Sequence, residues 1–293
     1  MTNQIFLYHY TSQKGLLGIL RTNKLWMTNI LYLNDSSEFL YTVDLVKTEL
    51  ENHKNLLLRK KGVVGLSLDE DIDGKMLYHF ELLESLLNGI FGDDDSISKI
   101  NIYVFSLSKG QDDLNQWRGY CPKEGGFCIE FNTNKLLSLV DKNKGYEIKE
   151  CKYCKKNGSP EIKTLVESFV SRLKDLILES SKGFTKVHRE FLSEIIRISP
   201  YIKNDSFHSE SEVRIIHESK SEDEINYCEG KSIIIPHVEF SPVDVDGKLP
   251  ISKIWIGPTP HPELSKLSVK SMLNTYGYKG VEVEISKIPY RSW

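Results

Sequence analysis

The chain has 293 residues, of which 40% are hydrophobic and 27% charged, and its formal net charge is −3. This is the composition of an ordinary globular protein, long enough for one large domain or two small ones. The slightly acidic balance disfavours a protein that binds duplex nucleic acid by neutralising phosphates over its whole surface. No apolar run approaches the roughly 18 residues of a membrane-spanning helix.

The N-terminus and the cysteines bear on where the protein works. The first residues lack the basic start and the long apolar run of a signal peptide, so we expect a cytoplasmic protein. The odd number of cysteines, five, favours free thiols in a reducing compartment. Cys151 and Cys154 form a CxxC pair, but no second pair or histidine follows at the spacing of a zinc site. We therefore expect no metal.

Strand and helix signals follow one another irregularly in the first half of the chain. Residues 5–10 have strand composition, and Thr11 or Ser12 can cap a helix over 13–22. Capping residues at Asn34, Asp35 and Glu38 predict a helix from 38 to about 53. The remaining expectations are a strand at 25–29, a loop at 59–75, a helix at 76–91 and an apolar strand at 100–107.

The second half predicts more strands and two long helices. A short helix carries Trp117, and the region 161–198 has two apolar stripes at helical spacing, divided near Gly183. The other expected elements are strands at 127–131, 146–153, 212–219, 231–235, 251–256 and 281–285, and a helix at 263–276. Strands and helices do not alternate regularly, and no glycine-rich dinucleotide motif or P-loop is present, so we predict an α+β fold.

His9 is the first candidate for chemistry, because it lies in a strand just before a helix begins. A histidine bonded to the backbone is the structural explanation. The functional one is that the Tyr10–Thr11–Ser12 junction offers helix amides to a phosphate, while His9 bonds a ribose hydroxyl.

Ser106 and Ser108 end the most apolar strand, and a period of two places both hydroxyls on one face. Either they cap the strand end or they face a ligand. Arg118 follows in the short helix; it either stacks on Trp117 or Tyr120 at the surface or clamps a phosphate or carboxylate.

Glu210 and Glu212 are two residues apart at the start of a predicted strand, so we expect both carboxylates on one face, with Arg214 beside them. A solvated edge strand with a salt bridge explains this pattern. The functional explanation is a carboxylate that stabilises an oxocarbenium cation during cleavage of a glycosidic bond. His208, His217, His237 and His261 show no metal-ligand spacing, and capping explains Asn34, Asp35 and Glu38 equally well.

Several multi-residue blocks resemble the bacterial domain-of-unknown-function family 2971, in that family's order, from Leu7 to Arg291. They are LYHYTS, VFSLSK followed by DDLNQWRGY, GGFCIEF, the EVR of residues 212–214, IWIGP and IPYR. That family in turn resembles the ADP-ribosyltransferase superfamily. His9 matches its first-strand residue, Ser106–Ser108 its Ser-x-Ser element, and Glu210–Glu212 its Glu-x-Glu element.

The second resemblance implies a split, mixed or antiparallel β-sheet in a single domain 1–293, with helical insertions near 54–99 and 158–200. It also implies NAD as substrate. His9 would bond the nicotinamide ribose, Ser108 with Ser106 would shape the nicotinamide pocket, and Tyr10 or Tyr120 would stack on nicotinamide. Glu212 would bond the ribose and stabilise the transition state, and Glu210 would activate or select the acceptor. Arg118 would grip a phosphate, and Thr11 would belong to the cofactor-binding residues.

The acceptor would be a macromolecule, protein or nucleic acid, and by analogy the setting would be a toxin or an antiviral defence system. Two other functions remain open. One is a module that binds a nucleotide without turning it over. The other is a nucleic-acid-acting protein that uses Arg59–Lys61 and the basic residues of 142–156.

Overall fold

The computed structural model describes residues 6–33, 38–61, 70–122, 125–155, 158–230 and 232–290. The chain divides into two compact units. Unit 1 consists of residues 1–33, 102–151 and 207–293, and unit 2 of residues 34–101 and 152–206. The expected insertions near 54–99 and 158–200 fall within unit 2; that the whole chain is one domain stays a prediction. Among the described residues, no helix is long and apolar enough to cross a membrane.

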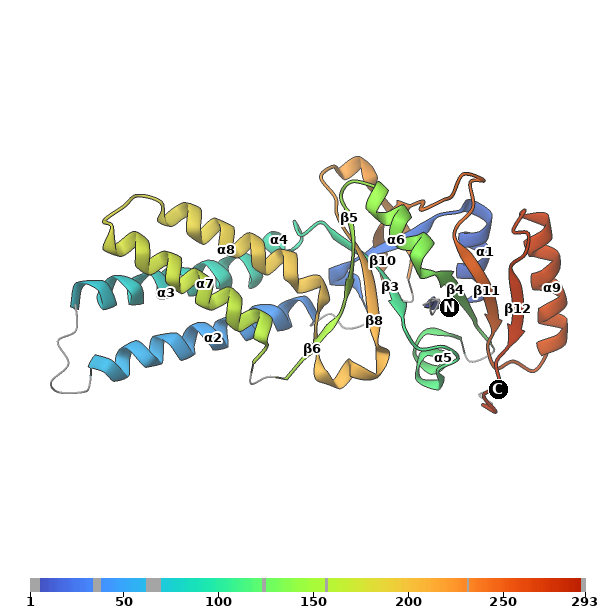
Figure 1. The fold of residues 1–293 in the computed structure, drawn as a ribbon, viewed down its shortest axis with the longest axis horizontal. Coiled ribbons are helices and arrows are strands. Elements are labelled where there is room, and N and C mark those ends of the chain that lie inside the picture. The colour runs from blue at the N-terminus through green and yellow to red at the C-terminus, as the bar shows by residue number, and fades with distance from the viewer. Residues whose placement is uncertain are drawn as a thin grey trace. The chain divides into compact units, whose positions relative to one another are not determined.

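Unit 1 is built on a mixed, mostly antiparallel sheet, which in the described chain has ten strands (Figure 1). Its main path runs β12–β11–β4–β1–β3–β2–β10–β9, and β8 pairs with both β3 and β5. Within this sheet, only the β11–β12 pair is parallel among the pairs described. The strands are β1 (Phe6–Thr11), β2 (Leu25–Asn29), β3 (Ile102–Ser108), β4 (Phe127–Asn132), β5 (Tyr146–Glu150), β8 (Glu212–Glu218), β9 (Ile225–Glu229), β10 (Ile234–Phe240), β11 (Ile251–Ile256) and β12 (Glu282–Ile285). The predicted α+β class is confirmed at this level.

Four helices accompany this sheet: α1 (Gln13–Thr22), α5 (Leu114–Tyr120), α6 (Thr133–Lys142) and α9 (Pro262–Thr275). The larger core of the unit packs apolar residues of α1, α6 and α9, such as Leu20, Leu136 and Leu273, against one face of the sheet. On the other face lies a smaller cluster of Tyr8, Tyr10, Trp117, Cys128 and Trp255. The two faces therefore differ in chemistry: the larger core is mainly aliphatic, and the smaller cluster is mainly aromatic.

Unit 2 is mainly helical. Helices α2 (Glu38–Lys61), α3 (Glu70–Phe91), α7 (Pro160–Leu178) and α8 (Phe184–Ile198) pack together, with α4 (Asp94–Ile97) beside α3 (Figure 1). A two-stranded parallel sheet joins β6 (Lys152–Cys154) to β7 (Ile202–Asn204). The apolar residues whose helical spacing predicted α3, α7 and α8 include several that are buried: Phe80, Leu83, Phe169 and Phe191.

Several predicted boundaries were wrong. Helix α2 continues to Lys61 and α3 begins at Glu70, so the whole described part of the expected 59–75 loop is helical. The expected strand 146–153 is two strands, because Cys151 lies between β5 and β6, which belong to different sheets. Helix α6 and strand β9 were not predicted, and β10 begins at Ile234 where a strand at 231–235 was expected. The Asn34 and Asp35 caps lie outside the described residues.

Candidate functional site

The sheet of unit 1 divides along one edge of β3. On that edge β2 pairs with Tyr103 and Val104, whereas β1 pairs only with Ser108. The opposite edge of β3 pairs with β8 from Ile102 to Ser108. Strands β1 and β2 therefore separate alongside residues 105–107 of β3, a stretch that includes Ser106 of the predicted Ser106–Ser108 element.

His9 lies at this division. Its Nδ1 is 3.0 Å from the carbonyl oxygen of Ser106, and its ring stacks on Phe105 with 4.3 Å between centroids. Because a carbonyl only accepts, Nδ1 carries the proton and Nε2 is left as the acceptor. Burial lowers the pKa of His9 to about 4, a shift that the bond to Ser106 opposes. His9 is therefore a neutral imidazole at pH 7.

A row of polar side chains crosses the sheet on its aromatic face. Tyr8 is the register partner of Ser108, and Ser108 of Glu212. All three are buried, at 4–5% exposure. Directly opposed residues point to the same side of a sheet and alternate residues to opposite sides, so His9 faces the aliphatic core and not this row. The structure thus brings Ser108 and Glu212 together but places the His9 side chain on the other face.

The Glu212 carboxylate is held by Arg214. The Nε of Arg214 donates to Oε1 of Glu212 at 2.7 Å, and its Nη2 donates to Oε2 at 3.0 Å. Both side chains are buried, as expected for residues two apart on the inner face of β8. This is a buried bidentate ion pair, in which each charge is stabilised by the opposite charge of its partner. The expected salt bridge is present, but on a buried strand between two neighbours and not on a solvated edge.

Glu210 is not part of the strand. It ends a 3₁₀ segment (Asp205–Glu210), and Ser211 follows with φ of 45°, in the left-handed region. The expectation that Glu210 and Glu212 share a strand face was therefore wrong, because Ser211 breaks the alternation. The Glu210 carboxylate instead accepts a hydrogen bond of 2.8 Å from the Tyr120 hydroxyl, near the surface.

The Ser108 hydroxyl fastens this turn. It donates to the Glu210 carbonyl at 2.8 Å and accepts from the Gly110 amide at 3.0 Å. Two backbone bonds satisfy the hydroxyl as a cap would, so Ser108 positions Glu210. Ser106 is the register partner of Arg214 on the same face.

The remaining predicted residues anchor α5 and its surroundings. The Tyr10 hydroxyl donates to the Gly110 carbonyl and accepts from the Asp113 amide. The pKa of Tyr10 is raised, mainly because the hydroxyl is buried and secondarily because Cys128 is close to it. Thr11 ends β1 and accepts a bond from the Cys121 thiol. Arg118 is exposed and stacks over the Tyr290 ring, 4.8 Å from its centroid. Arg118 thus stacks on an aromatic ring at the surface, as one of the two explanations expected, but the ring is Tyr290.

Residues 116–215 match the family model "Protein of unknown function (DUF2971)". The match covers about a third of the chain, including Arg118, Tyr120, Glu210 and Glu212, and supports the resemblance to that family. No curated protein matches, and no solved structure matches.

Two site residues were missed in the sequence, and one of them lies within the DUF2971 match. Glu130 is 4% exposed in β4, accepts a bond from Trp255 Nε1 at 3.0 Å and is the register partner of Tyr8, so it extends the polar row. A lone carboxylate inside the apolar run 127–131 was the available signal. Asp112, at φ 46°, accepts from Trp117 Nε1, Ser286 Oγ and the Lys287 amide, and ties the C-terminal segment to α5.

No group of three or more His, Cys, Asp or Glu side chains suited to a metal ion occurs in the described part of the chain. Cys151 and Cys154 are both buried free thiols.

Proposed function

We propose that the protein is an NAD-dependent ADP-ribosyltransferase that modifies a macromolecular acceptor. The observation that carries the proposal is the Tyr120–Glu210 pair, which lies near the surface just before β8. The neutral His9 imidazole lies where β1 and β2 part along β3, bonded to Ser106, on the other face of the sheet. The Glu212–Arg214 pair lies at the adjoining end of β8.

In the proposed reaction the bond between the ribose C1′ and the nicotinamide nitrogen breaks, and nicotinamide leaves with the bonding electrons. The positive charge that develops on the ribose is stabilised by a carboxylate. An acceptor nucleophile then forms a bond to C1′ and gives up a proton to a base. Nε2 of His9, an acceptor, would bind a ribose hydroxyl, and Arg118 would bind a phosphate.

The geometry supports Glu210 as the carboxylate that meets the sugar or the acceptor. Both oxygens of Glu212 accept from Arg214, whereas the Glu210 carboxylate lies nearer the surface beside Tyr120, whose side chain is 40% exposed. We therefore assign the reacting carboxylate to Glu210 and treat Glu212, with Arg214, as a positioning residue. This reverses the weight that the resemblance alone gives to the two acids.

The test is to incubate the protein with NAD labelled in the adenylate and with bacterial lysate, and to measure labelled macromolecules and free nicotinamide. Glu210→Gln should lower both by at least about 100-fold, because it removes a charge from the developing cation. Glu218→Gln, at the exposed end of β8, should react like the wild type. Equal labelling by Glu210→Gln, or neither transfer nor nicotinamide release by the wild type, would falsify the proposal.

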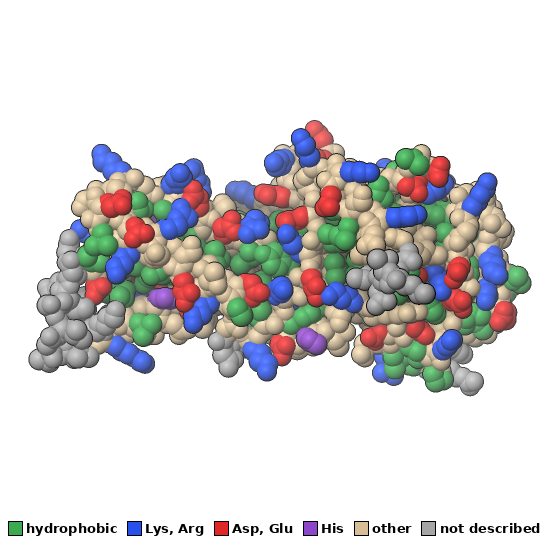
Figure 2. All heavy atoms as spheres, in the orientation of Figure 1, with side chains coloured by type: hydrophobic (Ala, Val, Ile, Leu, Met, Phe, Trp, Pro, Cys, Tyr) green, Lys and Arg blue, Asp and Glu red, His purple; other side chains and the backbone are tan. Residues whose placement is uncertain are grey.

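A second candidate is a module that binds the nucleotide without reaction, and the bidentate Glu212–Arg214 pair favours it, since that pair needs no ligand to satisfy the carboxylate. In that case NAD or ADP-ribose raises the melting temperature of the wild type and of Glu210→Gln equally, and no nicotinamide is released. The nucleic-acid alternative gains no support from the one face that Figure 2 shows. On the face shown in Figure 2, basic and acidic side chains are interspersed within each unit.

A further inference from the structure

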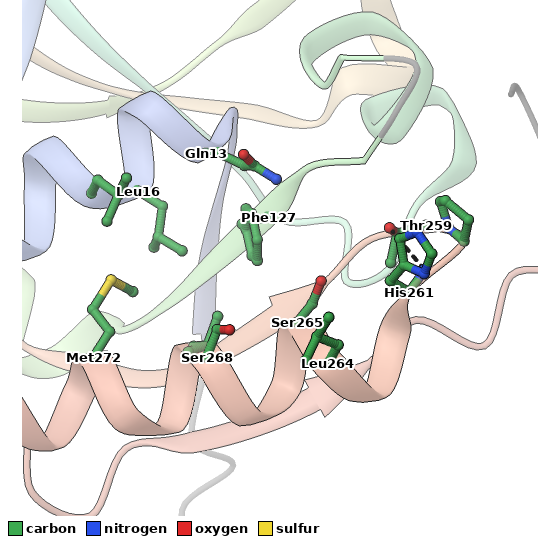
Figure 3. Close-up of a pocket in the computed structure, with 12 residues that line it drawn as sticks. Gln13, Leu16, Phe127, Thr259, His261, Leu264, Ser265, Ser268 and Met272 are labelled. Carbon is green, nitrogen blue, oxygen red and sulfur yellow. Dashed lines mark hydrogen bonds between the residues drawn. The ribbon is translucent and has the colours of Figure 1, made fainter.

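Unit 1 contains a cavity between α1 and α9, on the aliphatic side of the sheet (Figure 3). Its volume is about 510 Å³, within the range of about 300–1,000 Å³ that is typical of small-molecule sites. Phe127, which lines it, is the register partner of Thr11, so the cavity adjoins the junction of β1 with α1. None of the residues assigned to the proposed transferase reaction lines this cavity.

The cavity has an apolar body. Leu16, Phe127 and Val269 supply buried surface from the core, and Met272 lies at one end beside Leu16 (Figure 3). Leu17 and Leu264 also line it but are 48% and 65% exposed, which leaves apolar surface at the opening. Apolar side chains at the mouth of a cavity are stabilised when a ligand covers them.

Polar groups of the lining come from the start of α9, from its first two turns and from the start of α1. Thr259 and His261 lie at the end of the cavity away from Leu16 and Met272 (Figure 3), and Gln13, Ser265 and Ser268 add an amide and two hydroxyls. Among the described residues that line the cavity there is no Asp, Glu, Lys or Arg. These residues offer hydrogen bonds to the head group of a ligand, and they include no carboxylate that would attract a cation.

Two helices begin at this cavity, α1 at Gln13 and α9 at Pro262. The N-terminal end of a helix carries partial positive charge, which favours an anion over a cation. The His261 side chain does not cap α9, so it leaves the first-turn amides to other partners. The only acid of that turn, Glu263, is exposed and does not line the cavity.

We infer that this cavity binds a small amphipathic anion, with an aromatic or medium-chain aliphatic body against Leu16, Phe127 and Met272. Its carboxylate or sulfonate head lies toward Gln13, Thr259 and His261. This site is separate from the proposed transferase site and goes beyond that function.

The test uses anilinonaphthalene sulfonate, a fluorescent probe of this chemical class, with the full-length protein. Ser268→Phe places a ring over the cavity from an exposed position on α9 that lines it, and should weaken probe binding at least about tenfold. Ser271→Phe makes the same change at an exposed position of the same helix that does not line the cavity, and binding should stay within about twofold. Near-ultraviolet circular dichroism confirms that both variants are folded.

A second pair of variants tests the charge preference. Leu264→Asp places a carboxylate at the cavity and should weaken binding at least about tenfold, whereas Leu267→Asp, at 66% exposure outside the lining, should not. Octanoate should displace the probe and octylamine should not. Wild-type binding by Ser268→Phe, or displacement by octylamine as effective as by octanoate, would overturn the inference. Probe binding by Glu210→Gln should match the wild type, which separates this result from failure of the transferase proposal.

Discussion

At the scale of single residues, most of the candidate site consists of polar groups that hold one another. Arg214 fixes both oxygens of Glu212, Ser108 bonds the Glu210 carbonyl, and Trp255 bonds Glu130. A buried charge or hydroxyl is stable only when it is paired, so each partner is as important for the fold as the residue it holds.

Arg214→Met should therefore destabilise unit 1 by about 3–5 kcal/mol, because it leaves the Glu212 carboxylate buried without its charged partner. The double variant Glu212→Gln/Arg214→Met should be more stable than Arg214→Met alone. Arg21→Met replaces an exposed arginine of the same unit and should change stability by less than about 1 kcal/mol. All four tryptophans, at 26, 117, 255 and 293, belong to unit 1, so urea unfolding followed by tryptophan fluorescence reports on this unit. A single-variant loss no larger than that of Arg21→Met would show that the pair is not needed.

Gly257 is a second residue-scale prediction, since a side chain there has no room. A Cβ at this position would lie 2.7 Å from ring atoms of Trp117 and 3.0 Å from the Gly126 carbonyl. Gly257→Ala should destabilise unit 1 by about 1–3 kcal/mol in the same unfolding measurement. At Gly119, on the exposed side of α5, a Cβ meets nothing within 4 Å, so Gly119→Ala should be neutral or stabilising by up to about 1 kcal/mol. Equal effects of the two changes would contradict this packing argument.

At the scale of elements, local signals set the helix ends well where capping residues are present. Ser12 caps α1 by accepting from the Gly15 amide, Asp113 caps α5, and Ser159 precedes Pro160 at the start of α7. Strand ends were harder to predict, because a strand is defined by its partners. The break at Cys151 exists because the next strand joins another sheet.

Ser12→Ala should accordingly cost about 1 kcal/mol of unit 1 stability, since the Gly15 amide loses its acceptor at 3.1 Å. Amide hydrogen exchange at Gly15 should become faster, while exchange at residues in the middle of α9 should not change. Ser12→Asp keeps an acceptor at the cap and should retain most of the stability. Unchanged exchange at Gly15 in the alanine variant would show that the cap is dispensable.

At the scale of the whole molecule, two stretches of chain far apart in sequence, 34–101 and 152–206, form unit 2, and the other three form unit 1. Every residue of the candidate site belongs to unit 1. The buried histidines connect this architecture to pH. His9 and His237 in unit 1 and His79 in unit 2 have a lowered pKa, in each case mainly because burial disfavours the charged imidazole.

The pKa of His9 falls from an ordinary 6.5 to about 4 on folding, and this makes the stability of unit 1 depend on pH. The unfolded chain then binds the proton more tightly, so unit 1 should lose stability as pH falls from about 6.5 through about 4. The loss due to His9 is at most about 3 kcal/mol, and less to the extent that the ring is partly exposed. The measurement is the urea concentration at which unit 1 is half unfolded, followed by tryptophan fluorescence between pH 7 and pH 4. In His9→Gln this midpoint should fall less as the pH is lowered than in the wild type, whereas His261→Gln, at an exposed position, should behave like the wild type. A fall in His9→Gln equal to that of the wild type would exclude His9 as its source.

The sequence by itself determined the α+β class, most helices and most candidate polar residues, because periodicity, caps and polar residues at strand ends are local properties. Only the tertiary structure decided which candidates meet. The pairing of β3 with β1 and β8 aligns Tyr8, Ser108 and Glu212 in one row and turns His9 to the other face. Register and backbone conformation, such as the left-handed Ser211 between Glu210 and Glu212, depend on contacts with distant chain segments, and a linear pattern does not contain them.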